Sequence, residues 1–102
     1  MEFQLVIQFR PAGALDFGKL VAIEDALITE LRDSAIVDGH DIGSGEFNIF
    51  VVTSHPKESF VRTQSLLEEI KPEGEMNVAY REPNDERFVI LWPPNSPEFR
   101  IA

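Results

Sequence analysis

Residues 37–50, VDGHDIGSGEFNIF, contain most of the side chains in this chain whose types and spacing are suited to chemistry. Asp38, His40, Asp41 and Glu46 offer carboxylate oxygens and an imidazole nitrogen, which are ligands for hard or borderline cations. The glycines between them allow the backbone to wrap tightly around a bound group. This segment is therefore the first candidate for a binding site.

The spacing of these ligands argues against a metal site. A calcium-binding EF-hand loop needs acids at alternate positions and a glutamate at its twelfth position, and no register of the segment supplies them. Zinc prefers histidine and cysteine ligands, but the chain has no cysteine. The only other histidine, His55, stands at the start of a predicted helix elsewhere. We expect neither a metal nor a cofactor.

Gly43, Ser44 and Gly45 allow two interpretations. The backbone amides of a Gly-Ser-Gly segment are able to receive an anion or a carboxylate. Glycine is also the residue needed where a sharp turn requires a positive φ, and aspartates such as Asp38 and Asp41 bond to their own backbone in turns. We expect a connection longer than a minimal turn, and the sequence leaves open whether it binds a ligand or only turns the chain.

Catalysis is not indicated by the remaining nucleophiles. Neither Ser44 nor Ser54 lies in the G-x-S-x-G context of a nucleophile elbow, and no cysteine is present. Paired acids such as Glu68 and Glu69 are typical of solvated surfaces. The chain also lacks the G-x-x-x-x-G-K-[ST] and G-x-G-x-x-G phosphate-binding motifs. We therefore expect a protein that is not an enzyme.

Glu46, Asn48 and Phe50 share one side of a strand predicted over residues 46–53. A carboxylate and a carboxamide beside an aromatic ring are suited to binding a polar ligand or a basic side chain of a partner, and Trp92 is a further candidate for the same sheet face. A local explanation is also open, in which Glu46 accepts hydrogen bonds from the glycine amides and Asn48 pairs across the hairpin.

Hydrophobic alternation predicts the strands that position these residues. Residues 3–9 alternate as a half-buried strand, with Phe3, Leu5, Ile7 and Phe9 on one side. A short strand is expected near 34–38, and a hairpin joins 76–81 to a return strand at 86–92.

Two helices are predicted from spacing and capping residues. The first follows Asp16 as its N-cap, and the second starts at Ser54 or His55, with Pro56 in its first turn, and stops at 71–74. Their buried stripes are predicted to contain Leu20, Ile23, Leu27 and Leu31 in the first helix, and Phe60, Leu67 and Ile70 in the second.

This order predicts an α+β domain of the ferredoxin-like type, βαββαβ with an extra C-terminal strand, in which two helices cover one face of an antiparallel sheet. Residues 1–92 form this single domain, and residues 93–102 form an extended tail that contains prolines. The other sheet face is predicted to be open and to expose Val6, Phe50 and Val52. Exposed apolar area of this kind favours a homodimer through that face.

The charge excludes some partners and favours others. With 9 basic and 18 acidic residues the chain carries a formal charge of −9, which repels nucleic-acid phosphates and anionic membranes. The same field favours a basic protein partner. An acid at position 2 in place of a basic stretch, together with the absence of a long apolar run, predicts a cytoplasmic protein.

The pattern D-G-x-D-I-G-S-G-E-x-N-I-F over residues 38–50, followed by a threonine-serine-proline helix start, resembles a group of small bacterial proteins of uncharacterised function. The resemblance covers the middle third of the chain. It implies a free-standing ferredoxin-like domain and does not indicate any activity.

Together these observations predict a non-enzymatic domain that acts by protein association, either with itself or as an acidic inhibitor or immunity-type protein that caps a basic toxin. The alternative is a small-molecule sensor resembling ACT domains, in which paired copies hold a metabolite near the hairpin loop.

Overall fold

The computed structural model describes residues 1–11, 17–70 and 74–101. Along the chain it contains β1 (Phe3–Arg10), α1 (Phe17–Leu31), β2 (Ala35–Gly43), β3 (Glu46–Thr53), α2 (Pro56–Ile70), β4 (Glu75–Arg81) and β5 (Val89–Trp92). The five strands form one sheet in the order β2-β3-β1-β4-β5, and all neighbouring strands are antiparallel. The predicted α+β class, with two helices and an antiparallel sheet, is confirmed.

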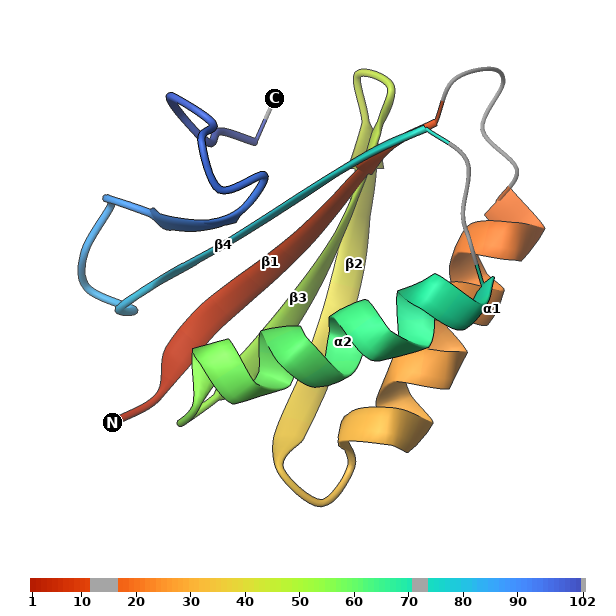
Figure 1. The fold of residues 1–102 in the computed structure, drawn as a ribbon, viewed down its shortest axis with the longest axis horizontal. Coiled ribbons are helices and arrows are strands. Elements are labelled where there is room, and N and C mark those ends of the chain that lie inside the picture. The colour runs from red at the N-terminus through yellow and green to blue at the C-terminus, as the bar shows by residue number, and fades with distance from the viewer. Residues whose placement is uncertain (12–16, 71–73, 102) are drawn as a thin grey trace.

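Both helices pack on the same face of the sheet, and the C-terminal segment lies on the opposite side of β4 (Figure 1). The predicted alternation of β1 and β3 and the predicted stripe of α1 are confirmed, because these side chains form one buried cluster. Its members are Leu5, Ile7, Phe9, Leu20, Ile23, Leu27, Leu31, Phe47, Ile49, Val51, Leu67 and Val78. Burial of this apolar surface is the main driving force for the fold.

The inner stripe of α2 differs from the prediction. Ile70 is 40% exposed and Phe60 is only half-buried, whereas Ser59 and Thr63 are buried together with Leu67. The two hydroxyl groups are accommodated because Ser59 shares a hydrogen bond of 2.8 Å with the Thr53 hydroxyl, and Thr63 donates to the Ser59 carbonyl at 2.8 Å. Polar residues whose hydrogen bonds are made locally thus occupy buried positions of the helix. A prediction based only on the spacing of apolar residues does not find them.

The start of α2 matches the prediction at His55. The His55 carbonyl accepts the first helical hydrogen bond from the Ser59 N–H at 3.0 Å, and the His55 N–H donates to the Thr53 hydroxyl at 3.0 Å. The predicted N-cap of α1, Asp16, lies outside the described residues, as do residues 71–73 of the predicted stop at 71–74.

The connection between β2 and β3 is shorter than predicted. β2 runs to Gly43, which pairs with Glu46, so only Ser44 and Gly45 form the turn. Their φ angles of 52° and 77° are the positive pair that a tight hairpin turn with right-handed twist requires. The long loop predicted after residue 38 is therefore wrong, because the polar residues of that segment belong to an exposed edge strand.

The return strand β5 begins at Val89, later than predicted. The Arg87 N–H and guanidinium both donate to Asp85, at 2.9 Å and 3.3 Å, which holds the preceding residues in a turn. These two hydrogen bonds, with the positive charge of Arg87, lower the pKa of the Asp85 carboxyl below its usual 3.8. Within the described residues, no helix is both long and apolar enough to cross a bilayer.

Two neighbouring positions on α1 provide a test of this packing. Leu27 is fully buried, so Leu27→Ala is expected to lower the free energy of unfolding by about 2–5 kcal/mol, through lost burial and a residual cavity. Ile28 is 46% exposed, so Ile28→Ala should change it by no more than about 0.5 kcal/mol. Urea denaturation followed by circular dichroism measures both, and equal losses would contradict the assigned helix face.

Candidate functional site

The middle of the sheet face opposite the helices is occupied by a buried polar network. Gln8 of β1 lies between Glu46 and Asn48 of β3, and all three residues are at most 3% exposed. The Gln8 amide donates to Glu46 Oε1 at 3.2 Å and to Asn48 Oδ1 at 3.0 Å. Asn77 of β4 donates to Gln8 Oε1 at 3.3 Å. The network therefore joins three neighbouring strands through their side chains.

The C-terminal segment completes this network. The Gln8 amide nitrogen also lies 3.0 Å from the carbonyl oxygen of Arg100. One amide has two N–H groups, and here three acceptors lie within 3.2 Å of its nitrogen, so one N–H is shared. No buried side-chain nitrogen or oxygen in the described ranges lacks a hydrogen-bond partner. Gln8 thus connects the sheet to a segment that is 92 residues distant in sequence.

Glu46 is the charged member of the network, and Arg10 is its ion-pair partner. Arg10 donates to Glu46 Oε2 from Nε at 3.1 Å and from a terminal nitrogen at 2.7 Å. The Glu46 side chain is 4% exposed and that of Arg10 is 44% exposed, so the carboxylate is buried while the guanidinium still contacts solvent. A buried carboxylate needs such a charged donor to offset its desolvation. Glu46 therefore accepts hydrogen bonds from side chains of β1 and does not serve only as a cap for the glycine turn.

This arrangement corrects the prediction of an open apolar face. Val6 and Ala79, which belong to this face, are fully buried, and Phe50 and Val52 are half-buried. The reason is that the side chains along the middle strands are long and polar, and residues 93–101 return over them to reach Gln8. The face that was predicted to seek a second copy is already covered at its centre by the chain itself.

His40 lies on the other face, beside α1, with its side chain 30% exposed. Its Nδ1 is 2.9 Å and 3.0 Å from the two carboxylate oxygens of Glu24 on α1. Its ring stacks on Phe47 at 4.9 Å between centroids and contacts Phe17 edge-on at 6.0 Å. Because a carboxylate oxygen only accepts hydrogen bonds, a proton must lie on Nδ1. The pair attaches edge strand β2 to helix α1.

The predicted site residues are therefore divided between two faces and an edge. Asp41 pairs with Asn48 and lies at the exposed edge of the network face, whereas His40 faces the helices. Phe50 lies on β3, but Trp92 lies on β5 at the far edge of the sheet and pairs with the core residue Val78. Phe50 and Trp92 thus do not form one site.

The remaining predicted residues all lie on the β2–β3 hairpin. Asp38 sits at a β-bulge between Val37 and Gly39, and Gly39 adopts a φ of 115°. Gly43, Ser44 and Gly45 are exposed at the hairpin end. Gly43 ends β2, and Ser44 and Gly45 form the turn.

Sequence reasoning missed Gln8, Arg10, Glu24 and Asn77. The alternation of β1 placed Gln8 beside Val6 on the network face, which was a usable signal. Its partners depend on the register between strands, which residue types do not specify.

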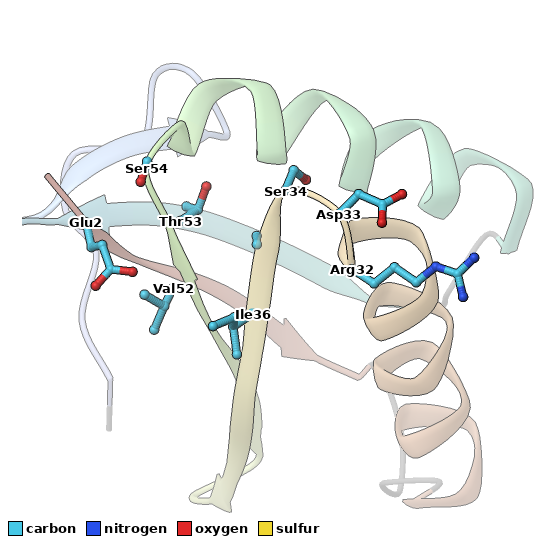
Figure 2. A pocket seen from close by; sticks show the side chains of 9 residues that line it. Glu2, Arg32, Asp33, Ser34, Ile36, Val52, Thr53 and Ser54 are labelled. Atoms are coloured by element: carbon cyan, nitrogen blue, oxygen red, sulfur yellow. The ribbon is translucent and has the colours of Figure 1, made fainter.

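A hollow of about 180 Å³ lies at the start of β2, between the end of α1 and the junction of β3 with α2. Ile36 and Val52 are register partners on its wall, and Ile36 is 64% exposed. Glu2 and Asp33 add carboxylates to its lining, and Arg32 directs its guanidinium away from the other lining side chains (Figure 2). The hollow thus combines an apolar wall with acidic groups beside the edge strand.

Comparison of the chain with protein-family models, with curated proteins and with solved structures finds no match. The resemblance of residues 38–50 to small bacterial proteins stays a prediction, and the function rests on the geometry described above.

The ion pair at Glu46 can be tested with a single and a double substitution. Arg10→Met removes two guanidinium donors to the buried Glu46 carboxylate, so the free energy of unfolding is expected to fall by about 1–3 kcal/mol. Adding Glu46→Gln removes the buried charge that Arg10 offsets and should recover at least half of this loss, as measured by denaturant titration. A double variant less stable than Arg10→Met would contradict a charge-driven effect.

The two histidines provide a matched comparison. His40→Leu removes the imidazole donor to the nearly buried Glu24 carboxylate and is expected to destabilise the fold by about 1–2 kcal/mol. His55 has an exposed side chain, so His55→Leu should change stability by less than about 0.5 kcal/mol. Thermal unfolding near neutral pH measures both, and indistinguishable midpoints would show that the His40–Glu24 contact contributes nothing.

Proposed function

We propose that this chain is a non-enzymatic protein-association domain, and that its contact surface is the outer edge of β2. The observation that supports this proposal is the exposure of the strand, because all nine residues of β2 are exposed or half-exposed. In the sheet order, β2 stands at the end with β3 as its only neighbour among the described strands. The partner we propose is an extended, basic segment of another protein.

An edge strand of this length is suited to binding by strand addition. Alternate residues of an antiparallel edge strand direct their backbone N–H and C=O groups away from the sheet, where an incoming strand can pair with them. In natural proteins, lysine or proline on an edge strand commonly prevents it from pairing with another chain. The sequence of β2, AIVDGHDIG, contains neither residue. The bulge after Val37 interrupts the edge, and the four residues from His40 to Gly43 continue it in regular register.

Side chains beside the edge select the chemistry of the partner. Asp38 and Asp41 on β2 are exposed, as are Glu2 and Asp33 at the adjoining hollow, while Ile36 offers an apolar anchor. A second copy paired along β2 would bring like charges together, which destabilises cross-strand pairs. A basic strand instead gains from these carboxylates and from the net charge of −9. This favours the acidic inhibitor or immunity-type role over pairing of identical edges.

The strand order β2-β3-β1-β4, with a helix after β1 and another after β3, supports the ferredoxin-like assignment, to which β5 is an addition at the β4 edge. An ACT-like sensor of this architecture would hold its metabolite near the hairpin loop of a dimer. That loop is a turn of only two residues, and the alternative stays a prediction without a supporting contact.

The proposal is tested with a synthetic peptide of alternating lysine and valine, titrated into the ¹⁵N-labelled chain at low salt. We expect saturable shifts of backbone amides along β2 and at Ile36, with β5 unaffected, because the peptide adds to one edge only. A peptide of alternating glutamate and valine should give no shifts.

Two charge reversals separate local pairing from general attraction. Asp41→Lys changes the edge itself and should weaken binding of the basic peptide at least tenfold. Glu58→Lys makes the same change of charge on the exposed start of α2 and should alter the affinity by less than threefold. Equal effects of both variants, or shifts spread over all acidic surfaces, would show that only net charge attracts the peptide.

A further inference from the structure

The C-terminal segment is bound to the network face as a separate ligand would be. Contacts with the rest of the chain include a hydrogen bond from the Gln8 amide to the Arg100 carbonyl and the packing of Phe99 on Phe88, with ring centroids 4.8 Å apart. The first contact engages a backbone carbonyl, which every extended peptide possesses. The second requires an aromatic side chain one residue earlier.

The two residues that contact the segment, Gln8 and Phe88, are held in place by other parts of the chain. Gln8 retains Glu46, Asn48 and Asn77 as partners within the sheet. Phe88 is held by Arg81, whose guanidinium carbon lies 5.7 Å from the ring centroid. Arg81 is fixed in turn by donating to Gln4 Oε1 at 2.9 Å. A surface preorganised in this way loses little conformational entropy when it binds a peptide.

The segment itself is held loosely. Most residues of 93–101 are exposed, and only Ser96, Phe99 and Ile101 are half-buried. The segment also forms internal bonds: the Ser96 hydroxyl donates to the Glu98 carbonyl at 3.1 Å, and Arg100 pairs with Glu98 at 2.8 Å. These internal bonds survive if the segment leaves the face. Dissociation breaks the Gln8–Arg100 hydrogen bond and the Phe88–Phe99 contact, and it exposes the part of the network face that the segment covers.

We propose that the network face is a binding surface for an extended peptide that carries an aromatic residue. In solution, the peptide that binds there is the C-terminal segment of a second copy of the chain, so that two chains exchange their segments. The exchanged dimer contains the same contacts as a single chain. Its formation therefore costs mainly the entropy of association, and the fraction of dimer rises with protein concentration. This form of self-association does not rest on the role proposed for β2.

The test uses the full-length chain and a fluorescein-labelled peptide of residues 93–102, PPNSPEFRIA, followed by fluorescence anisotropy. In the wild type the peptide must compete with the attached segment. In Phe99→Ala the attached segment is loosened, so the apparent affinity for the peptide should rise at least tenfold, because the free face is more populated. Circular dichroism verifies that the variant is folded.

Two controls define the contact. The same peptide with alanine in place of its phenylalanine should bind the Phe99→Ala chain at least tenfold more weakly. Phe17→Ala, which removes an exposed aromatic ring from the helix side, should bind the unaltered peptide as the wild type does. Equal affinities of the two peptides, or of the wild-type and Phe99→Ala chains, would overturn the proposed surface.

Sedimentation equilibrium identifies the source of the peptide. A dimer that grows with wild-type concentration and dissociates on addition of excess unlabelled peptide is expected. A chain that stays monomeric at millimolar concentration, or a dimer that the peptide leaves intact, would overturn exchange between copies. Asp38→Lys reverses an exposed charge at the bulge of β2, where no network residue is its register partner, so it should leave both results unchanged. This separates the proposal from the role of β2.

Discussion

The buried carboxylate of Glu46 is the constraint on which the second face of this sheet depends. A charge with so little exposure must be compensated, and Arg10 provides two N–H donors for one of its oxygens. Gln8 and Asn48 then complete a layer of polar side chains over the middle of the sheet. Since polar groups in such a layer have to satisfy one another, the layer specifies the register of β1 against β3.

The two faces of the sheet are therefore stabilised by different physics. The helix side is an apolar cluster, and its contribution to stability is proportional to the apolar area removed from water. Such a cluster tolerates substitutions between apolar residues of similar volume. The network side depends on directional bonds between particular atoms, and it extends to a carbonyl of the C-terminal segment. His40 and Glu24 make a similar directional contact at the margin of the apolar cluster, where β2 meets α1.

This arrangement underlies the two association surfaces that we propose, which differ in their chemistry. The outer edge of β2 presents backbone groups and carboxylates, and it suits an extended partner of opposite charge. The network face presents a preorganised amide and an aromatic ring, and it suits a peptide like the one that covers it. Neither surface requires the chain to perform a reaction, in agreement with the proposed non-enzymatic role.

The sequence by itself determined the order of the elements, the inward side of β1, α1 and β3, and the presence of a glycine-containing connection before β3, although not its two-residue length. These follow from local periods and turn preferences, which short-range sterics and burial impose. The tertiary structure alone decided that the polar residues of 38–43 form an edge strand, that Phe50 and Trp92 lie far apart, and that the predicted open face is covered. The physical reason is that those outcomes depend on strand register and on a contact between Gln8 and Arg100, which are distant in the chain and become neighbours only when the sheet has formed.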